Sequence, residues 1–224
     1  VVGPGNRYVT AAKMFLRGRV EIDFPAGPSE IAVIADDTAR PDFIAADILA
    51  QSEHDPLAAS LLITTSPRLA EEVGGWINTL CEDAERKSII AESLGRSGYL
   101  VVDDLKQAVE ATDRIAPEHL SIQVRDPLPV LGKIKHAGSI FIGPYAPVAC
   151  GDYASGTNHV LPTAGNARHY SGLNVAHFTK TSTVQIIDRE GLEEIGDIVE
   201  TIATAEGLTA HADSIRIRRN SPTS

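Results

Sequence analysis

The sequence is poor in cysteine, in positive charge and in long apolar runs. Only two cysteines occur among 224 residues, and their isolation excludes a disulfide framework and a CxxC metal motif. Acidic residues outnumber basic ones by 30 to 20, and the net charge of −10 argues against binding to nucleic acid. No apolar run reaches the roughly 20 residues that span a bilayer, and no signal-peptide pattern opens the chain. We therefore expect a soluble protein of the reducing cytoplasm, with no membrane partner.

The order of apolar and polar segments indicates an α/β fold. Apolar residues make up 43% of the chain and charged residues 22%, as in globular proteins. Strand-like and helix-like segments alternate over residues 30–145, which predicts a largely parallel sheet with flanking helices. Two β-branched runs, at 20–24 and 30–35, predict strands separated by a Pro/Gly turn. Ser66 followed by Pro67 predicts a capped helix start.

The amino-acid composition of the sequence changes after Pro147. The stretch ACGDYASGTNHVLPTAGNARHYSG is rich in Gly, Ser, Thr, Asn and His without periodicity, and it predicts a long loop. A helix, a break near Gly207 and a second, more polar helix are expected to follow. These two helices form a small C-terminal tail.

The motif QSEH places Gln51 and His54 three residues apart at the end of an expected helix. On a helix this spacing puts two side chains on one face, close enough to share a ligand. Glutamine is an uncommon metal ligand, and a polar stripe on a helix surface has the same pattern. The spacing by itself leaves both interpretations open.

The motif APEHL carries two adjacent titratable groups. Pro117 disfavours helix at the residue before it, so the helix of DLKQAVEATDRI is expected to stop there. Glu118 and His119 then lie at a helix-to-strand junction, at one edge of the sheet. A Glu-His pair suits separate acid and base roles. A chance polar dipeptide at a turn is the alternative.

The motif GDYASGTNH combines a carboxylate, a phenol, hydroxyls, an amide and an imidazole within nine residues. Gly151 and Gly156 would let the backbone approach a ligand closely. A solvated loop has a similar composition. GPGN at residues 3–6 could cradle a phosphate, but it lacks the spacing of a dinucleotide-binding fingerprint.

Six motifs together resemble the histidinol dehydrogenase family. VGPGN, PAGPSE, QSEH, PEHL, GDYASGTNHVLPT and AEGLTAH stand in the order and approximate spacing of that family, from residue 1 to about 218. The family's chain continues well upstream of the first motif. The resemblance implies a zinc-dependent, NAD-linked four-electron oxidation of L-histidinol to L-histidine by way of histidinaldehyde.

The resemblance also implies a role for each matched residue. Glu118 would activate water for the second oxidation, and His119 would accept and return protons. The zinc ligands would be Gln51, His54, Asp152 and His211. Substrate would be bound by Ser29, Gln51, His54, His119, Asp152, His159, Glu206 and His211, and the cofactor by Asn6.

The resemblance further implies three parts and a partner. Residues 1–28 would end a cofactor-binding domain, and residues 29–173 would form the main α/β domain, an incomplete Rossmann-like fold. Residues 174–224 would be a helical tail that docks on a second subunit, giving a homodimer with exchanged tails. The competing hypotheses are a zinc hydrolase of a small polar substrate and a non-catalytic fragment that retains the metal site.

Overall fold

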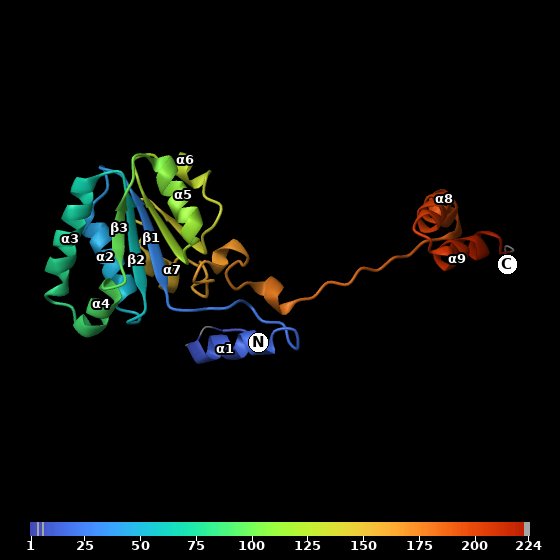
Figure 1. Cartoon of the computed structure of the whole chain (residues 1–224), viewed down its shortest axis with the longest axis horizontal. Helices are drawn as coiled ribbons and strands as arrows, with labels where there is room; N and C mark the ends of the chain where they lie inside the picture. Colours follow the sequence, from blue (N-terminus) through green and yellow to red (C-terminus); the bar gives the residue numbers. More distant parts are fainter. Residues whose placement is uncertain (4, 6, 222–224) are drawn as a thin grey trace. The chain divides into compact units, whose positions relative to one another are not determined.

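The computed structural model describes residues 1–3, 5 and 7–221. The chain divides into two compact units, Val1–Phe178 and Thr179–Ser224, and each is described by itself (Figure 1). The expected three-part division at residues 28 and 173 stays a prediction. No helix within the described residues is long and apolar enough to cross a membrane.

The first unit is built on a five-stranded sheet in the order β3-β2-β1-β4-β5 (Figure 1). Every neighbouring pair of strands is parallel, which confirms the predicted α/β fold with its parallel sheet. The central strand β1 is almost wholly buried, as its run of β-branched residues predicts. The strands are β1 (Glu30–Ala35), β2 (Ala59–Thr64), β3 (Gly98–Val101), β4 (His119–Gln123) and β5 (Ser139–Ile142).

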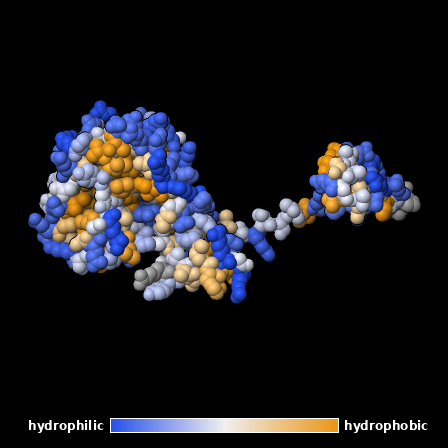
Figure 2. Space-filling model, in the orientation of Figure 1, coloured by the Kyte–Doolittle hydropathy of each residue, from blue (hydrophilic) through white to orange (hydrophobic). Residues whose placement is uncertain are grey.

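Helices cover both faces of this sheet. Alternate residues of β1 point to opposite faces: Ile31 and Val33 pack with α2, α3 and α7, whereas Ala32 and Ile34 pack with α5 and α6. Edge strand β3 is exposed along its length, and Figure 2 shows apolar surface in this part of the first unit. The helices of this unit are α1 (Arg7–Leu16), α2 (Pro41–Ser52), α3 (Pro67–Cys81), α4 (Lys87–Leu94), α5 (Leu105–Ile115), α6 (Leu128–Leu131) and α7 (Val148–Tyr153), with short 3₁₀ turns η1 (Asn166–Arg168) and η2 (Val175–Phe178).

Local capping interactions set several helix ends. The Ser66 hydroxyl accepts a hydrogen bond from the Leu69 backbone N–H at 3.2 Å, which confirms the predicted start of α3. Helix α5 ends at Ile115, and Ala116 adopts a left-handed conformation with φ 53°. The predicted stop before Pro117 is therefore also confirmed.

Two local expectations are wrong, and one further helix has no counterpart in them. Residues 20–24 form no strand, because a strand needs a neighbouring strand to pair with. The segment is held instead by the Asp23 carboxylate, which accepts hydrogen bonds from Lys13 Nζ (2.6 Å) and the Phe24 N–H (2.7 Å). Helix α4 was not expected from the sequence. Helix α7 lies inside the predicted loop, because Val148 packs in the core and anchors this turn of helix beside Phe141.

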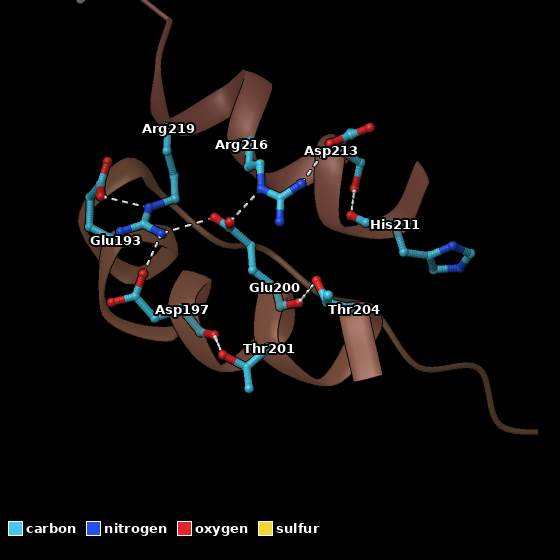
Figure 3. Close-up of polar contacts among 10 residues, drawn as sticks. Glu193, Asp197, Glu200, Thr201, Thr204, His211, Asp213, Arg216 and Arg219 are labelled. Atoms are coloured by element: carbon cyan, nitrogen blue, oxygen red, sulfur yellow. Dashed lines mark hydrogen bonds and ion pairs between the residues drawn. The ribbon is translucent and has the colours of Figure 1, made fainter. Parts of the chain in front are cut away.

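The second unit is a pair of helices, α8 (Arg189–Ala205) and α9 (Thr209–Arg219), separated by Gly207 with φ 77°. The predicted break near Gly207 is confirmed. An ionic cluster joins the helices: Arg219 contacts three carboxylates of α8, those of Glu193, Asp197 and Glu200 (Figure 3). Charge pairing rather than a large apolar core holds this unit together.

Candidate active site

Residues from five of the six sequence motifs line one cavity of about 460 Å³ in the first unit. The cavity lies at the amino ends of β1 and β4, whereas α/β sheets more often bind ligands at their carboxyl ends. The wall also includes Gly5, Ala26, Gly27, Tyr153, Val160, Leu161 and Thr163. The predicted site residues that line it are Ser29, His54, Glu118, His119, Asp152 and His159.

Strand pairing explains why Ser29 and Glu118 meet. Ile31 of β1 lies beside His119 of β4, so the residues just before each strand lie side by side. The Glu30 backbone N–H donates to the Glu118 carboxylate at 3.0 Å, and the Glu118 N–H donates to the Glu30 carboxylate at 3.3 Å. The Ser29 side chain also bonds to the Glu118 carboxylate. The two strand starts are thus tied together reciprocally.

Glu118 is held in its protonated form by its surroundings. Its side chain is only 4% exposed, and burial raises its pKa from 4.5 to about 8. The negative charges of Glu30 and Asp152 raise the pKa further, and hydrogen bonds from Glu30 and Ser29 oppose the rise. A carboxyl group with a pKa near neutrality is suited to act as a general base or acid.

His119 is held neutral by the same burial. Its side chain is 4% exposed, and burial lowers its pKa from 6.5 to about 4, against the opposing charge of Asp152. The Nδ1 atom lies 3.5 Å from the Glu118 carboxylate, but neither ring nitrogen has a hydrogen-bond partner among the described residues. Both nitrogens remain available to a ligand in the cavity.

The candidate metal ligands of the first unit are Gln51, His54 and Asp152. Gln51 lies in the last turn of α2, which runs back from β1 toward the amino ends of the strands, and His54 lies in the turn that follows. The Gln51 side chain is 3% exposed, and its Nε2 has no hydrogen-bond partner among the described residues. His54 and Asp152 line the cavity.

An amide, an imidazole and a carboxylate are a donor set that fits zinc or a similar divalent ion. The orphaned buried amide of Gln51 supports this fit, because rotation of the group would present its oxygen to a cation. The described residues contain no group of three or more His, Cys, Asp or Glu side chains placed to hold a metal. The three side chains therefore fit a metal by residue type, and only His54 and Asp152 of the three line the cavity.

The remaining predicted residues lie elsewhere. His211 is in the first turn of α9, and Glu206 caps the end of α8, so both belong to the second unit. Both side chains are exposed. Asn6 lies outside the described residues.

Sequence reasoning missed two residues that shape the cavity, Glu30 and Thr163. The Glu30 carboxylate accepts hydrogen bonds from the backbone N–H groups of Glu118 and, at 3.0 Å, Ala164. Thr163 is only 2% exposed, and its hydroxyl accepts a hydrogen bond from the Gly27 N–H. Both residues fall inside quoted motifs, PAGPSE and HVLPT, but only the folded chain shows that these motifs touch each other.

Comparison with known proteins gives a consistent result. Residues 1–219 match the family model described as histidinol dehydrogenase. Histidinol dehydrogenase of Methanosarcina barkeri is 56% identical over 218 residues, which are 97% of this chain and 50% of that protein. That of Methanocaldococcus jannaschii is 54% identical over 218 residues, 97% of this chain and 51% of that protein.

A solved structure agrees with the sequence matches. The crystal structure of histidinol dehydrogenase from Elizabethkingia anophelis has a TM-score of 0.93 and 41% sequence identity, covering 97% of this chain and 50% of that chain. The chain thus spans about half the length of the relatives it matches. It belongs to the histidinol dehydrogenase family.

Proposed function

We propose that this chain supplies the substrate-binding and acid-base residues for the zinc-dependent, NAD-linked oxidation of L-histidinol to L-histidine through histidinaldehyde. The observation that carries the proposal is the first cavity, where residues of five separate motifs line one volume of about 460 Å³. Membership of the family supports the same reaction.

His119 would accept the proton of the substrate hydroxyl in the first oxidation. Its imidazole is neutral because of burial, so a ring nitrogen has a lone pair available. Neither nitrogen has a hydrogen-bond partner within the described residues, although Nδ1 lies 3.5 Å from the Glu118 carboxylate, so a ligand can bond to the ring without breaking a hydrogen bond. The same group would accept a proton again when the aldehyde hydrate is oxidised.

Glu118 would remove a proton from the water that adds to histidinaldehyde. Its pKa of about 8 makes the ionised form a stronger base than an ordinary carboxylate. The bonds to the Glu30 N–H and the Ser29 side chain fix its position beside His119. Only the aldehyde-to-acid step needs this water, so Glu118 acts in the second oxidation.

Zinc would be held by Gln51, His54 and Asp152, with His211 as the fourth ligand, and would supply an anchor for the imidazole and amine nitrogens of histidinol. NAD⁺ would accept a hydride in each oxidation, with Asn6 as its proposed contact. Ser29, His159 and Glu206 would help to hold the substrate.

We propose a homodimer in which each second unit completes the partner's site with His211 and Glu206. In α9 only Ala212 is buried among the described residues, and α8 exposes Ile198 and Ile202. Helices with so little of their apolar surface covered are suited to dock on another surface. The free thiols of Cys81 and Cys150 suit a reducing, cytoplasmic setting.

The reaction is tested by incubating the full-length product of the reading frame with histidinol and NAD⁺. We expect two molecules of reduced cofactor per histidinol. Glu118→Gln should retain the alcohol-to-aldehyde step and lose most of the aldehyde-to-acid step, whereas His119→Asn should impair both. Equal loss of both steps in Glu118→Gln would remove Glu118 from the proposed role.

Tail exchange is tested by mixing two inactive variants, His54→Ala and His211→Ala. In an exchanged dimer one site combines both lesions and the other is intact, so mixing should restore about a quarter of wild-type activity. The matched control mixes His54→Ala with Asp152→Asn, which alter the same unit and should not complement. Failure of the first mixture after verified subunit exchange would contradict tail exchange.

A further inference from the structure

A second cavity, of about 390 Å³, is formed by α2 and the segment between β5 and α7. Its wall includes Phe43, Asp47, Tyr145, Cys150 and two prolines. It shares no lining residue with the first cavity, and none of the residues proposed for the reaction lines it. It therefore needs an explanation of its own.

Asp47 is the charged group in the wall of this cavity. The residue is 7% exposed, and its carboxylate has no hydrogen bond or ion pair with any residue that the structure describes. Burial alone raises its pKa from 3.8 to about 6. A carboxylate that is ionised at neutral pH, nearly buried and without a partner is costly unless a ligand compensates it.

The walls around Asp47 are aromatic. The rings of Phe43 and Tyr145 meet edge to face with centroids 6.2 Å apart. The guanidinium of Arg40 lies 4.4 Å from the Phe43 ring centroid, which shows that this ring already accepts a cation on one side. That guanidinium is paired with Asp42, through Nε at 2.8 Å, rather than with Asp47.

This combination selects for one chemical class. A carboxylate that shares a cavity wall with aromatic rings and prolines favours an organic cation, whose charge meets the carboxylate while its alkyl part covers apolar surface. A divalent metal ion would require more oxygen or nitrogen donors than one carboxylate supplies. A neutral apolar ligand would leave Asp47 without a partner.

We propose that this cavity, here named the Asp47 cavity, binds a primary ammonium or guanidinium group. The cation pairs with the Asp47 carboxylate, and its alkyl chain lies against the rings of Phe43 and Tyr145. A free amine and a Lys or Arg side chain of another polypeptide offer the same chemistry. The site does not depend on the proposed oxidation, because the two cavities have no residue in common.

The direct test titrates propylammonium and methylguanidinium into the isotope-labelled chain at slightly alkaline pH, with amide shifts of α2 and of residues 145, 146 and 148–150 as the readout. We expect saturable binding that weakens roughly tenfold or more in Asp47→Asn, since a charge-assisted contact is lost. The control Glu53→Gln removes an exposed carboxylate at the end of α2 and should bind as wild type does. Uncharged propionamide should not bind.

Absence of saturable binding, or equal affinity in wild type and Asp47→Asn, would overturn the proposal, as would equal binding of propionamide. The source of the cation is resolved in the full-length protein at increasing concentration. Undiminished binding supports a free amine. If the probe no longer binds once the protein assembles, and Asp47→Asn assembles more weakly than wild type, the cation is a side chain from another polypeptide. If the probe no longer binds but Asp47→Asn assembles as wild type does, the charge pairing is contradicted.

Discussion

Replacing Glu118 with Gln should change how the stability of the chain depends on pH. The pKa of Glu118 is about 8 in the folded chain against 4.5 for an ordinary glutamate. Between these values the native state holds a proton that the unfolded state has released. The free energy of unfolding therefore contains a contribution that is complete below pH 4.5 and is lost as the pH rises through 8.

The size of this effect follows from the separation of the two pKa values, about 3.5 pH units. At about 1.4 kcal/mol per unit, the upper limit is about 5 kcal/mol. Glutamine cannot ionise and keeps an oxygen that accepts the Glu30 N–H. We subtract the unfolding free energy of wild type from that of Glu118→Gln. This difference should be constant below pH 4.5 and should become more positive, which means a relatively more stable variant, as the pH rises to about 8.

Urea unfolding followed by circular dichroism across this pH range measures the difference directly. Glu53→Gln, which removes an exposed carboxylate, is the matched control and should give a flat difference. A Glu118→Gln difference that stays within about 0.5 kcal/mol across the range, or that favours wild type at high pH, would refute burial of the protonated carboxyl.

His119 provides a second check with the opposite sign. Its pKa is about 4 in the folded chain and 6.5 for an ordinary histidine, so the unfolded state holds the extra proton between these values. Its presence makes the wild type gain stability as the pH rises from 4 to 6.5, and His119→Asn should lack this gain. Because His119 Nδ1 lies 3.5 Å from the Glu118 carboxylate, the double variant shows how strongly the two titrations are coupled.

Three further perturbations test other contacts. Lys13→Met should lower the unfolding free energy in urea by about 3 kcal/mol or more, because it leaves the buried Asp23 carboxylate without its cation, and adding Asp23→Asn should recover part of the loss. Gly151→Ala should cost about 1–3 kcal/mol in the same assay, because the new methyl would lie 2.6 Å from the Phe141 ring, and an unchanged midpoint would contradict that packing. Arg219→Met should speed hydrogen exchange of the α8 amides roughly tenfold through loss of three charge contacts, while exchange in the sheet stays unchanged.

The position of the first cavity follows from how the helices return to the sheet. Helix α2 leaves the carboxyl end of β1 and runs back across the sheet, so Gln51 arrives at the amino ends of the strands. Glu118 and His119 arrive there from the other direction, because Pro117 ends the connection just before β4. Residues that precede strands and residues that end helices are thereby gathered in one place.

The sequence determined the elements whose signals are local. Ser66 and Pro67 marked the start of α3, Pro117 marked the end of α5, and alternating strand and helix patterns indicated the parallel sheet, because capping and backbone restriction act within a few residues. The run at 20–24 shows the limit of such signals. Whether an extended segment becomes a strand depends on a neighbour that local sequence does not specify.

The candidate site also has some features that the sequence determined and others that only the tertiary structure decided. The motifs named Glu118 and His119 as a titratable pair, and the residue types were enough to suggest acid-base chemistry. Only the tertiary structure decided that burial holds the first protonated and the second neutral, because desolvation depends on everything packed around a group. It alone placed the Glu30 carboxylate on the Glu118 backbone and left Asp47 nearly buried without a partner, since both arise from contacts between segments far apart in the chain.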